Sequence, residues 1–276
     1  MKKVINFILT LIILVLICLF FISLNLKKVV VNSLSKSYVK SEITNEITNE
    51  LKNKFNIDNY DYLEKLENNI SNNEVVLNVT EKYFDSMVNN IINDKNDIPD
   101  IKEDLNKILN DNKNDLKQNN INISDEDIDK IASELVENKN IEKAYKIVLS
   151  KVKNNIGTKE VKIIKLYNTI ITPSFRYILI FIMLFLTILI GVIKKSFYKW
   201  TYNLGIAFII SGFMLTFLSQ LLLDLLLDLF SEYNTNLDIN INNIINSGYL
   251  CFIIGLVLVI IYIIGNKISK RKKALN

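Results

Sequence analysis

The residues best suited to do chemistry are two aspartates in an almost pure leucine run, LSQLLLDLLLDLF, at residues 218–230. Gln220, Asp224 and Asp228 are four residues apart, so on a helix they fall on one face. We call these three residues the acidic stripe. Carboxylates at the end of a membrane helix attract cations or pack against a partner helix. The spacing therefore predicts an ion site or a helix-contact site at the acidic stripe.

A structural interpretation of the acidic stripe competes with this functional one. Thr216 and Gly212 continue the stripe inward at the same helical spacing. If the span begins near residue 204, about twenty residues fill the hydrocarbon layer, which puts Asp224 at its outer edge. Asp228 then lies about 6 Å beyond that edge. We favour the simpler interpretation, in which the helix projects past the membrane and its aspartates face water.

The rest of the sequence offers no catalytic constellation. The 276 residues include no histidine, the commonest general base and metal ligand. Cys18 and Cys251 both fall in apolar runs, where a thiol behaves as a small buried hydrophobe. Glycine-rich phosphate loops and GxSxG elbows do not occur. We expect a non-enzymatic protein without catalytic residues, cofactor or metal.

Two acidic clusters, residues 94–97 and 125–129, invite comparison with a calcium-binding EF-hand loop. That loop needs a glycine at its sixth position for a sharp turn. Pro99 and Lys130 stand at the sixth position of the two clusters. Acids that follow Ser124 also suit the first turn of a helix, where they complement the helix dipole. The second cluster therefore predicts a helix start rather than a metal site.

Apolar residues, half of the chain, are segregated from the charged ones. Residues 7–26 form an apolar run that exceeds a usual signal-peptide core and lacks a small-residue cleavage site, so we favour an uncleaved anchor. Further apolar runs occupy residues 177–193, 204–223 and 249–264. The runs at 7–26 and 204–223 are long enough to cross the hydrocarbon layer of about 30 Å as helices. The runs at 177–193 and 249–264 are near the lower limit for spanning, and flanking aromatic residues and lysines can anchor such helices. The sequence therefore predicts four transmembrane helices.

Positive charge near the ends of these helices predicts their direction. Ten basic residues stand in three acid-free segments, which four spans place on one side of the membrane. They are Lys2, Lys3, Lys194, Lys195, Lys199, Lys267, Lys270, Arg271, Lys272 and Lys273. The positive-inside rule makes that side cytoplasmic, so both termini are expected inside the cell. Abundant Asn, Ile and Lys suggests a bacterial plasma membrane.

The long polar segment between the first two spans, residues 27–174, reads as a helical bundle. Its only glycine is Gly157 and its only internal proline is Pro99, so it lacks the turn-forming residues that usually separate strands and form hairpins. Ser71 and Glu74 have the Ser-x-x-Glu form of a capping box, which predicts a helix start. An apolar stripe at helical spacing comprises Leu34, Tyr38, Ile43, Ile47, Leu51 and Phe55.

The charge of this segment excludes one class of partner. Residues 27–171 carry 22 lysines and 25 acids, evenly mixed, so no basic surface for nucleic acid is expected. Residues 160–171, EVKIIKLYNTII, fit a helix or a strand, and we favour the helix. Polar residues at 56–60, 93–100 and 110–122 are interpreted as linkers between helices.

We therefore predict an all-α membrane protein: four transmembrane helices with a large extracytoplasmic helical bundle inserted between the first and second. The expected segments are a first transmembrane helix (1–26), the extracytoplasmic domain (27–174), a second transmembrane helix (175–193), a cytoplasmic loop (194–202), a third transmembrane helix extending outward (203–230), an outer loop (231–247), a fourth transmembrane helix (248–265) and a basic cytoplasmic tail (266–276).

The leading functional hypothesis is display of the extracytoplasmic domain for binding a protein partner, for assembly or for sensing at the bacterial cell surface. The expected contacts are the lipid bilayer and a protein partner, without nucleic acid. The alternative is a subunit of a homo-oligomeric transporter or channel with Gln220, Asp224 and Asp228 at its outer mouth. Four spans with few polar residues make a poor pore for one chain, so this alternative requires self-association.

Overall fold

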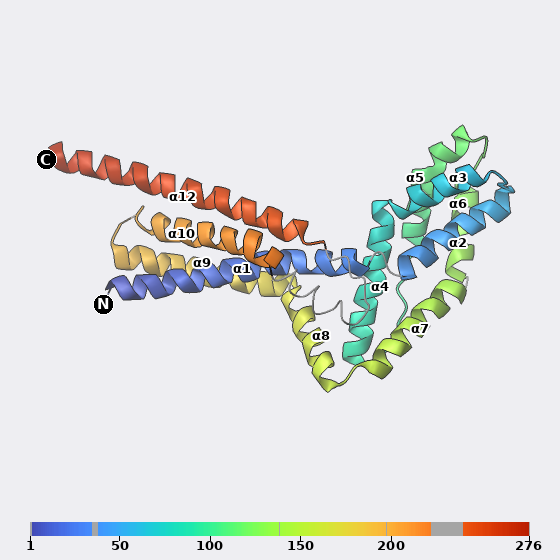
Figure 1. Cartoon of the computed structure of the whole chain (residues 1–276), viewed down its shortest axis with the longest axis horizontal. Helices are drawn as coiled ribbons and strands as arrows, with labels where there is room; N and C mark the ends of the chain where they lie inside the picture. Colours follow the sequence, from blue (N-terminus) through green and yellow to red (C-terminus); the bar gives the residue numbers. More distant parts are fainter. Residues whose placement is uncertain (1, 35–37, 138, 197, 222–239, 276) are drawn as a thin grey trace. The chain divides into compact units, whose positions relative to one another are not determined.

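The protein is all-helical wherever its structure is described. The computed structural model describes residues 2–34, 38–137, 139–196, 198–221 and 240–275 (Figure 1). Within these ranges every regular element is a helix and no strand occurs. Four of the helices are long and apolar enough to cross a membrane, as the sequence predicts. The protein is therefore an all-α protein with four candidate membrane spans.

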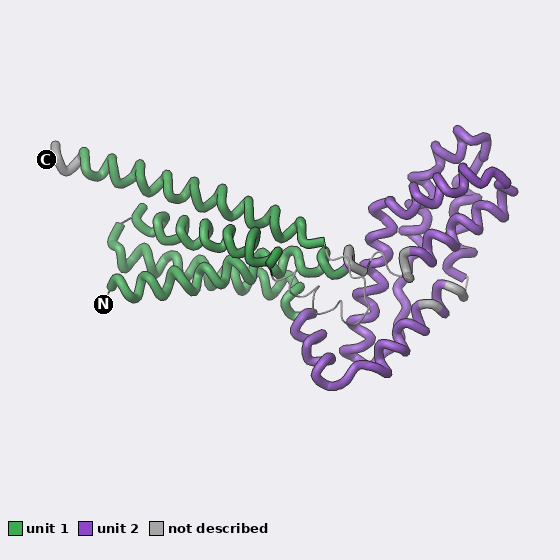
Figure 2. Tube along the Cα trace, in the orientation of Figure 1, with its two compact units in different colours: residues 1–30, 169–276 green, residues 31–168 purple. Residues whose placement is uncertain are grey.

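The chain divides into two compact units (Figure 2). Unit 1 consists of residues 1–30 and 169–276, and unit 2 consists of residues 31–168. Unit 1 contains the apolar helices, and unit 2 contains the polar segment between the first and second of them. Each unit has its own hydrophobic cluster.

The apolar helices of unit 1 are longer than the apolar runs that predict them. They are α1 (Lys2–Leu34), α9 (Pro173–Lys194), α10 (Trp200–Phe213) with the π turn η1 (Met214–Leu218), and α12 (Asn242–Leu275). Residues 242–247, expected in an outer loop, already belong to α12. The basic tail is also helical up to Leu275. Hydrophobicity marks only the part of a helix that lies in lipid, so polar turns at either end escape a search for apolar runs.

The start of α9 shows how local sequence sets a helix boundary. Thr172 is the N-cap residue of α9 and has an extended backbone conformation. Its hydroxyl accepts a hydrogen bond of 3.3 Å from the Phe175 N–H. Pro173 follows at the first helical position, where its missing N–H costs nothing and its fixed φ suits the helix. At the other end, Lys195 closes the helix with a left-handed backbone at φ 48°.

Polar contacts show that the four apolar helices alternate in direction. Asn203 on α10 donates to the Thr10 hydroxyl on α1 at 2.6 Å, which joins the N-terminal parts of these two helices. Lys194, the last residue of α9, also donates to Asn203. The ring of Tyr198, just before α10, packs against Gly265 near the C-terminal end of α12. The three basic segments therefore meet at one end of unit 1, which we call the basic end.

Contacts at the opposite end of unit 1 complete the same arrangement. Ser23 on α1 donates to the carbonyl of Ile170 at 2.5 Å, and Arg176 on α9 donates to the Ser23 hydroxyl at 3.2 Å. Asn25 on α1 donates to the Ser247 hydroxyl on α12 at 2.8 Å. Here the C-terminal part of α1 meets the N-terminal parts of α9 and α12. We call this end the far end.

The core of unit 1 draws side chains from all four apolar helices. It comprises Ile13, Ile17, Phe21, Ile190, Ala207, Leu215 and Cys251, all buried. Most other large side chains of these helices remain exposed, as expected for surfaces that face hydrocarbon rather than water. The buried fraction of each span is accordingly low.

Unit 2 is built from shorter amphipathic helices. These are α2 (Tyr38–Phe55), α3 (Tyr60–Ser71), α4 (Glu74–Asn93), α5 (Lys102–Gln118), α6 (Asp125–Glu137), α7 (Lys139–Asn155) and α8 (Thr158–Ile170). The segment with two possible structures, residues 160–171, is thus a helix up to residue 170. Residues 110–118, interpreted as part of a linker, belong to α5 instead. Residues 35–37 lie outside the described ranges, so the predicted continuation of α1 into α2 is not described.

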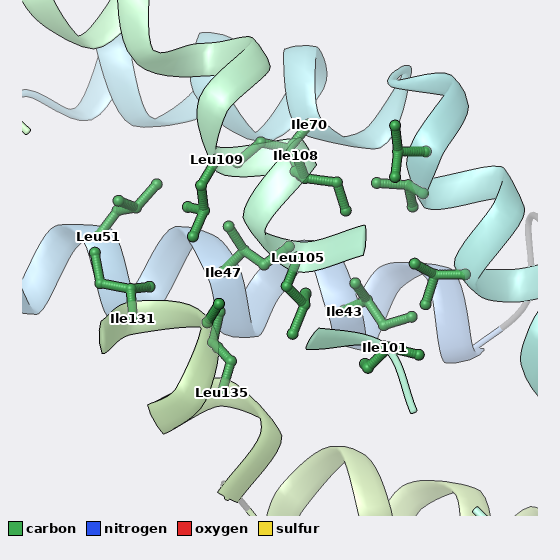
Figure 3. Packing of buried hydrophobic residues seen from close by; sticks show 14 of the residues in the cluster. Ile43, Ile47, Leu51, Ile70, Ile101, Leu105, Ile108, Leu109, Ile131 and Leu135 are labelled. Atoms are coloured by element: carbon green, nitrogen blue, oxygen red, sulfur yellow. The ribbon is translucent and has the colours of Figure 1, made fainter. Parts of the chain in front are cut away.

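Helix α2 is the centre of unit 2 and contacts α3, α4, α6 and α7. Ile43, Ile47 and Leu51 on its apolar stripe are fully buried, as their spacing predicts. Figure 3 shows these side chains and those of Leu105, Ile108 and Leu109 pointing toward a common interior. The other members of this core come from α3 to α7 and from the connections between helices, where Ile57, Ile101 and Ile123 are buried. One apolar face per helix is enough to close the bundle.

Two helix starts in unit 2 test the capping rules. The Ser124 hydroxyl accepts from the Asp127 N–H at 3.1 Å and donates to the Asp127 carboxylate at 2.6 Å, so the predicted start of α6 is confirmed. The predicted capping box at Ser71 is wrong, because Ser71 is the last residue of α3. Asn73 caps α4 instead, and its side chain accepts from the Val75 N–H at 2.8 Å. Asparagine is as good an N-cap as serine, and it stands next to the helix.

A buried amide fixes the connection between α4 and α5. The Asn90 side chain, 1% exposed, donates to the Asp97 carbonyl at 2.7 Å and accepts from the Asp97 N–H at 3.0 Å. It also donates to the Tyr145 hydroxyl on α7 at 2.9 Å. Both the donor and the acceptor of this amide are satisfied, as a buried polar group requires. The segment before Pro99 is therefore held to two helices by a single side chain.

Candidate functional site

The acidic stripe is described only at its inner end. Asp224 and Asp228 lie outside the described residues, so their role as an ion or helix-contact site stays a prediction. Gln220 lies in the last described turn of the third span, and its side chain is exposed. Thr216 and Gly212 are buried. The structure thus separates Gln220 from the two residues that were expected to continue the stripe inward.

Helix α12 covers the inner part of this face. A Cβ on Gly248 would lie 2.6 Å from the Thr216 side chain and 3.0 Å from the Gly212 carbonyl oxygen. The Thr216 hydroxyl donates to the Gly212 carbonyl at 2.9 Å. The π turn η1, Met214–Leu218, lies between α10 and Gln220. The residues expected to continue the stripe inward are therefore packed against α12, whereas Gln220 is exposed.

Gly212 belongs to a close contact between α10 and α12. A Cβ on Gly212 would lie 2.8 Å from the Gly248 carbonyl oxygen, and a Cβ on Gly255 would lie 2.8 Å from that of Gly205. We call these four residues the glycine seam. The two pairs are seven residues apart on each antiparallel helix, so they repeat every two turns. Backbone approaches backbone here, and only glycine leaves the space.

The glycine seam is a membrane-type contact. Lipid tails are as apolar as leucine, so helices in a membrane associate through close van der Waals packing of small residues. The sequence contains no GxxxG pair, and its glycines accordingly gave only a weak signal. Pairing across two helices at a spacing of seven is visible only once the helices are placed side by side.

The acids of unit 2 are used in ion pairs and caps. Asp125 pairs with Lys113, Asp129 pairs with Lys102 at 3.0 Å, and Asp94 pairs with Lys153 at 3.0 Å. Hydrogen bonds from Lys113 lower the pKa of the Asp125 carboxyl. The Ser124 hydroxyl and N–H likewise lower the pKa of Asp127. Both acidic clusters that were compared with an EF-hand loop thus contribute acids to solvent-exposed ion pairs.

The described residues form no cluster that could hold a metal ion. Within residues 2–34, 38–137, 139–196, 198–221 and 240–275, no group of three or more Cys, Asp or Glu side chains lies close enough to hold a metal ion. The described part of unit 1 contains no acid at all, since its four acids fall within residues 222–239. Cys18 and Cys251 are free thiols.

Unit 2 exposes a small hollow with a mixed polar and apolar lining. Ile98 and Val136 are 39% and 43% exposed and line this cavity of about 50 Å³ together with Pro99 and Glu142. Ile98 precedes α5 and Val136 is the second-last residue of α6, so residues from two separate parts of the chain meet here. Exposed apolar side chains that adjoin a hollow are typical of surfaces that take up a partner side chain. The hollow is a candidate contact surface.

Comparison with known proteins adds no assignment. No protein-family model, no curated protein and no solved structure matches the chain.

The glycine seam leads to a stability prediction. Gly255→Ala places a methyl group 2.8 Å from the Gly205 carbonyl oxygen and 2.9 Å from the Ile209 nitrogen, neither of which yields easily. We expect a loss of about 1–3 kcal/mol, seen as faster hydrogen–deuterium exchange in α10 and α12 of the detergent-solubilised chain. Gly191→Ala is the matched control, because its nearest neighbour is 3.8 Å away. Equal exchange rates in the two variants would contradict close packing of α10 against α12 at the glycine seam.

The Ser124 cap leads to a pH prediction. Asp127 has a pKa below its ordinary value of 3.8, so its charge stabilises the fold above that pH. This contribution is lost as the pH falls through the lowered pKa. Ser124→Ala removes the hydroxyl, which lowers the pKa of Asp127 most, and leaves the Ser124 backbone N–H in place. Helix α6 should therefore exchange faster than in the wild type at about pH 6 and differ less at about pH 3.

The control for this cap is Ser133→Ala on the same helix. The Ser133 hydroxyl donates to the Asp129 carbonyl at 2.7 Å and is not part of the cap. The Ser133→Ala variant should leave the pH dependence of α6 exchange unchanged. If Ser124→Ala increased the exchange rate of α6 by the same factor at both pH values, the result would argue against a role for the Asp127 charge.

Proposed function

We propose that the chain is a non-enzymatic, multi-pass protein of a bacterial plasma membrane that displays unit 2 outside the cell to bind a protein partner, for assembly or sensing. The observation that carries this proposal is the basic end of unit 1. Ten basic residues flank or end the apolar helices there, and acids are absent from all three segments. Such segments are retained in the cytoplasm during membrane insertion.

The chain path supports display of unit 2 on the opposite side. Unit 2 follows α1 and precedes α9, and the far end is where the C-terminal part of α1 meets the start of α9. With the basic end in the cytoplasm, a chain leaving at the far end enters the extracytoplasmic space. A core drawn from six helices then gives unit 2 a fold that depends on its own contacts.

Helix α8 is suited to lie at the membrane surface. It exposes Ile163 and Leu166, 65% and 60%, on one face next to lysines at 159 and 162. Apolar side chains bordered by lysine are typical of helices that lie in the headgroup region. Only two residues separate α8 from α9, so its end must be near the membrane. We therefore assign the partner contact to a different surface, the hollow at Ile98 and Val136.

The transporter alternative depends on residues outside the described ranges. Asp224 and Asp228 would have to line an outer mouth in an oligomer. Gln220, the one described member of the acidic stripe, is exposed and makes this neither more nor less favourable. The alternative therefore remains a hypothesis.

The proposed orientation predicts a labelling pattern. In a Cys18→Ala, Cys251→Ala background, Asn114→Cys places one thiol on the exposed surface of α5, and Lys270→Cys places one on the tail. A membrane-impermeant maleimide should label the first in intact cells and the second only after permeabilisation. The reverse pattern would overturn the orientation and leave the fold untouched.

The proposed contact surface predicts a selective loss of partner. Ile98→Ser with Val136→Ser makes the hollow polar without emptying the core, since both residues are partly exposed. The full-length chain, purified from native membranes in mild detergent, should lose at least one protein that accompanies the wild type. Ile147→Ser is the control, because Ile147 is 54% exposed and does not line the hollow. Identical co-purifying proteins for all three chains would count against the surface.

A further inference from the structure

A groove of about 540 Å³ opens between α1 and α10 at the basic end of unit 1. Its walls are almost entirely apolar and include residues spaced by three or four along each helix, so they form continuous faces. The charged side chains, Lys3 and Lys194, lie at one end of the groove, and Thr10 and Asn203 are the polar residues farther along its walls. The residues that carry the argument are Lys3, Asn6, Leu11, Lys194, Ile206 and Ile210.

The groove has the depth of one half of a bilayer. Its wall on α1 extends from Lys3 to Leu14, about 16 Å along the helix axis at 1.5 Å per residue. Half of the hydrocarbon layer is about 15 Å. A ligand seated in the groove therefore has its polar group among the basic residues and its apolar part beside α1 and α10. This is the shape of a lipid from the adjoining leaflet.

The mouth of the groove carries positive charge. Lys194 donates to the Asn203 amide oxygen and to the Lys199 carbonyl at 3.1 Å, and its Nζ lies 5.7 Å from the Tyr202 ring centre. These contacts hold the ammonium group in place and use two of its three N–H donors. Lys3 adds a second charge. The described residues of unit 1 include no carboxylate that would neutralise this pair. The missing partner is an anion.

The groove also presents an acceptor that lacks a donor. The Oδ1 atom of Asn6 is buried and has no hydrogen-bond partner within the protein. A buried acceptor without a donor is unfavourable and usually indicates a missing partner. A phosphate group offers acceptors only, so it satisfies the lysines but not Asn6. A hydroxyl group on the same ligand would satisfy Asn6.

We propose that this groove binds one anionic phospholipid with a hydroxyl-bearing headgroup, of the phosphatidylglycerol type. The phosphate pairs with Lys3 and Lys194, the headgroup hydroxyl donates to Asn6, and an acyl chain lies against Leu11, Ile206 and Ile210. Basic pockets between membrane helices are known sites for anionic headgroups. This site is independent of the orientation of the protein and of any partner of unit 2.

Native mass spectrometry of the full-length chain in detergent measures this binding. Phosphatidylglycerol should bind more tightly than phosphatidylcholine with the same acyl chains. Glycerol 3-phosphate, which carries a phosphate and hydroxyl groups but no acyl chains, should bind at least tenfold more weakly. If glycerol 3-phosphate bound as tightly as the lipid, the groove would be a site for a soluble phosphate compound. If phosphatidylcholine bound equally well, the charge argument would fail.

Charge variants test the headgroup contacts. Lys194→Gln should weaken phosphatidylglycerol binding about fivefold, which corresponds to about 1 kcal/mol for one lysine near a membrane surface. Lys270→Gln is the matched control, because it removes the same charge from the basic end outside the groove. Equal losses in the two variants would indicate a general electrostatic attraction. Asn6→Ala should reduce the difference in affinity between phosphatidylglycerol and the same lipid with its headgroup hydroxyls methylated.

A steric variant keeps the test valid if Lys194→Gln fails to fold. Leu11→Trp fills the groove from α1 and leaves every charge in place, so it should abolish the preference for phosphatidylglycerol. Ile12→Trp is the control, because Ile12 is the next residue, is 40% exposed and lies outside the groove. Unchanged binding to the Leu11→Trp protein would place the lipid elsewhere and overturn the proposal.

Discussion

The hydrocarbon layer solvates neither charge nor an unpaired backbone group, and the organisation of this chain follows from that restriction. Backbone groups in lipid must be satisfied within their own segment, which a helix does and an open sheet does not. The described apolar helices accordingly have no acid, and their lysines gather at the helix ends. Charged residues are collected in unit 2, where they pair with one another in water. The two units therefore differ in the forces that hold them.

Unit 2 closes through the hydrophobic effect, which requires water on its outside. Its central helix buries Ile43, Ile47 and Leu51 completely, and charged side chains cover the opposite faces. Unit 1 has no such driving force between its helices, because their outer surfaces are already in an apolar medium. Close contact between backbones, as at Gly205 and Gly255, takes its place. A single methyl group is consequently more disruptive in the seam than on the lipid-facing side of α9.

Local sequence was a good guide to unit 2 where a single physical rule acted. The Ser124 cap and the apolar stripe of α2 were both predicted, because capping and helical periodicity depend on neighbours along the chain. Ser71 was misassigned because Asn73 offers an equivalent cap two residues later and nothing local ranks the two. The ends of α12 were missed for a different reason: the helix continues past its apolar part, which hydropathy cannot detect.

The candidate sites were harder to predict, because they form between helices. A spacing of four along one helix does not reveal that α12 covers Gly212 and Thr216 and leaves Gln220 exposed. The groove unites Lys3 and Asn6 with Lys194, which lies nearly two hundred positions later in the sequence, and the three belong to no motif. The only sign of the groove in the sequence is the cluster of lysines at the helix ends. From sequence alone, that cluster indicates orientation and not a binding site.

Helix α12 has a mechanical consequence. Its 34 residues span about 51 Å, whereas the hydrocarbon layer is about 30 Å thick. The same rod therefore emerges from the bilayer on at least one side, without a proline or a break between Asn242 and Leu275. A twist or piston-like displacement applied at its first turn would reach the lysine-rich tip undiminished, since no joint lies between them to absorb the motion.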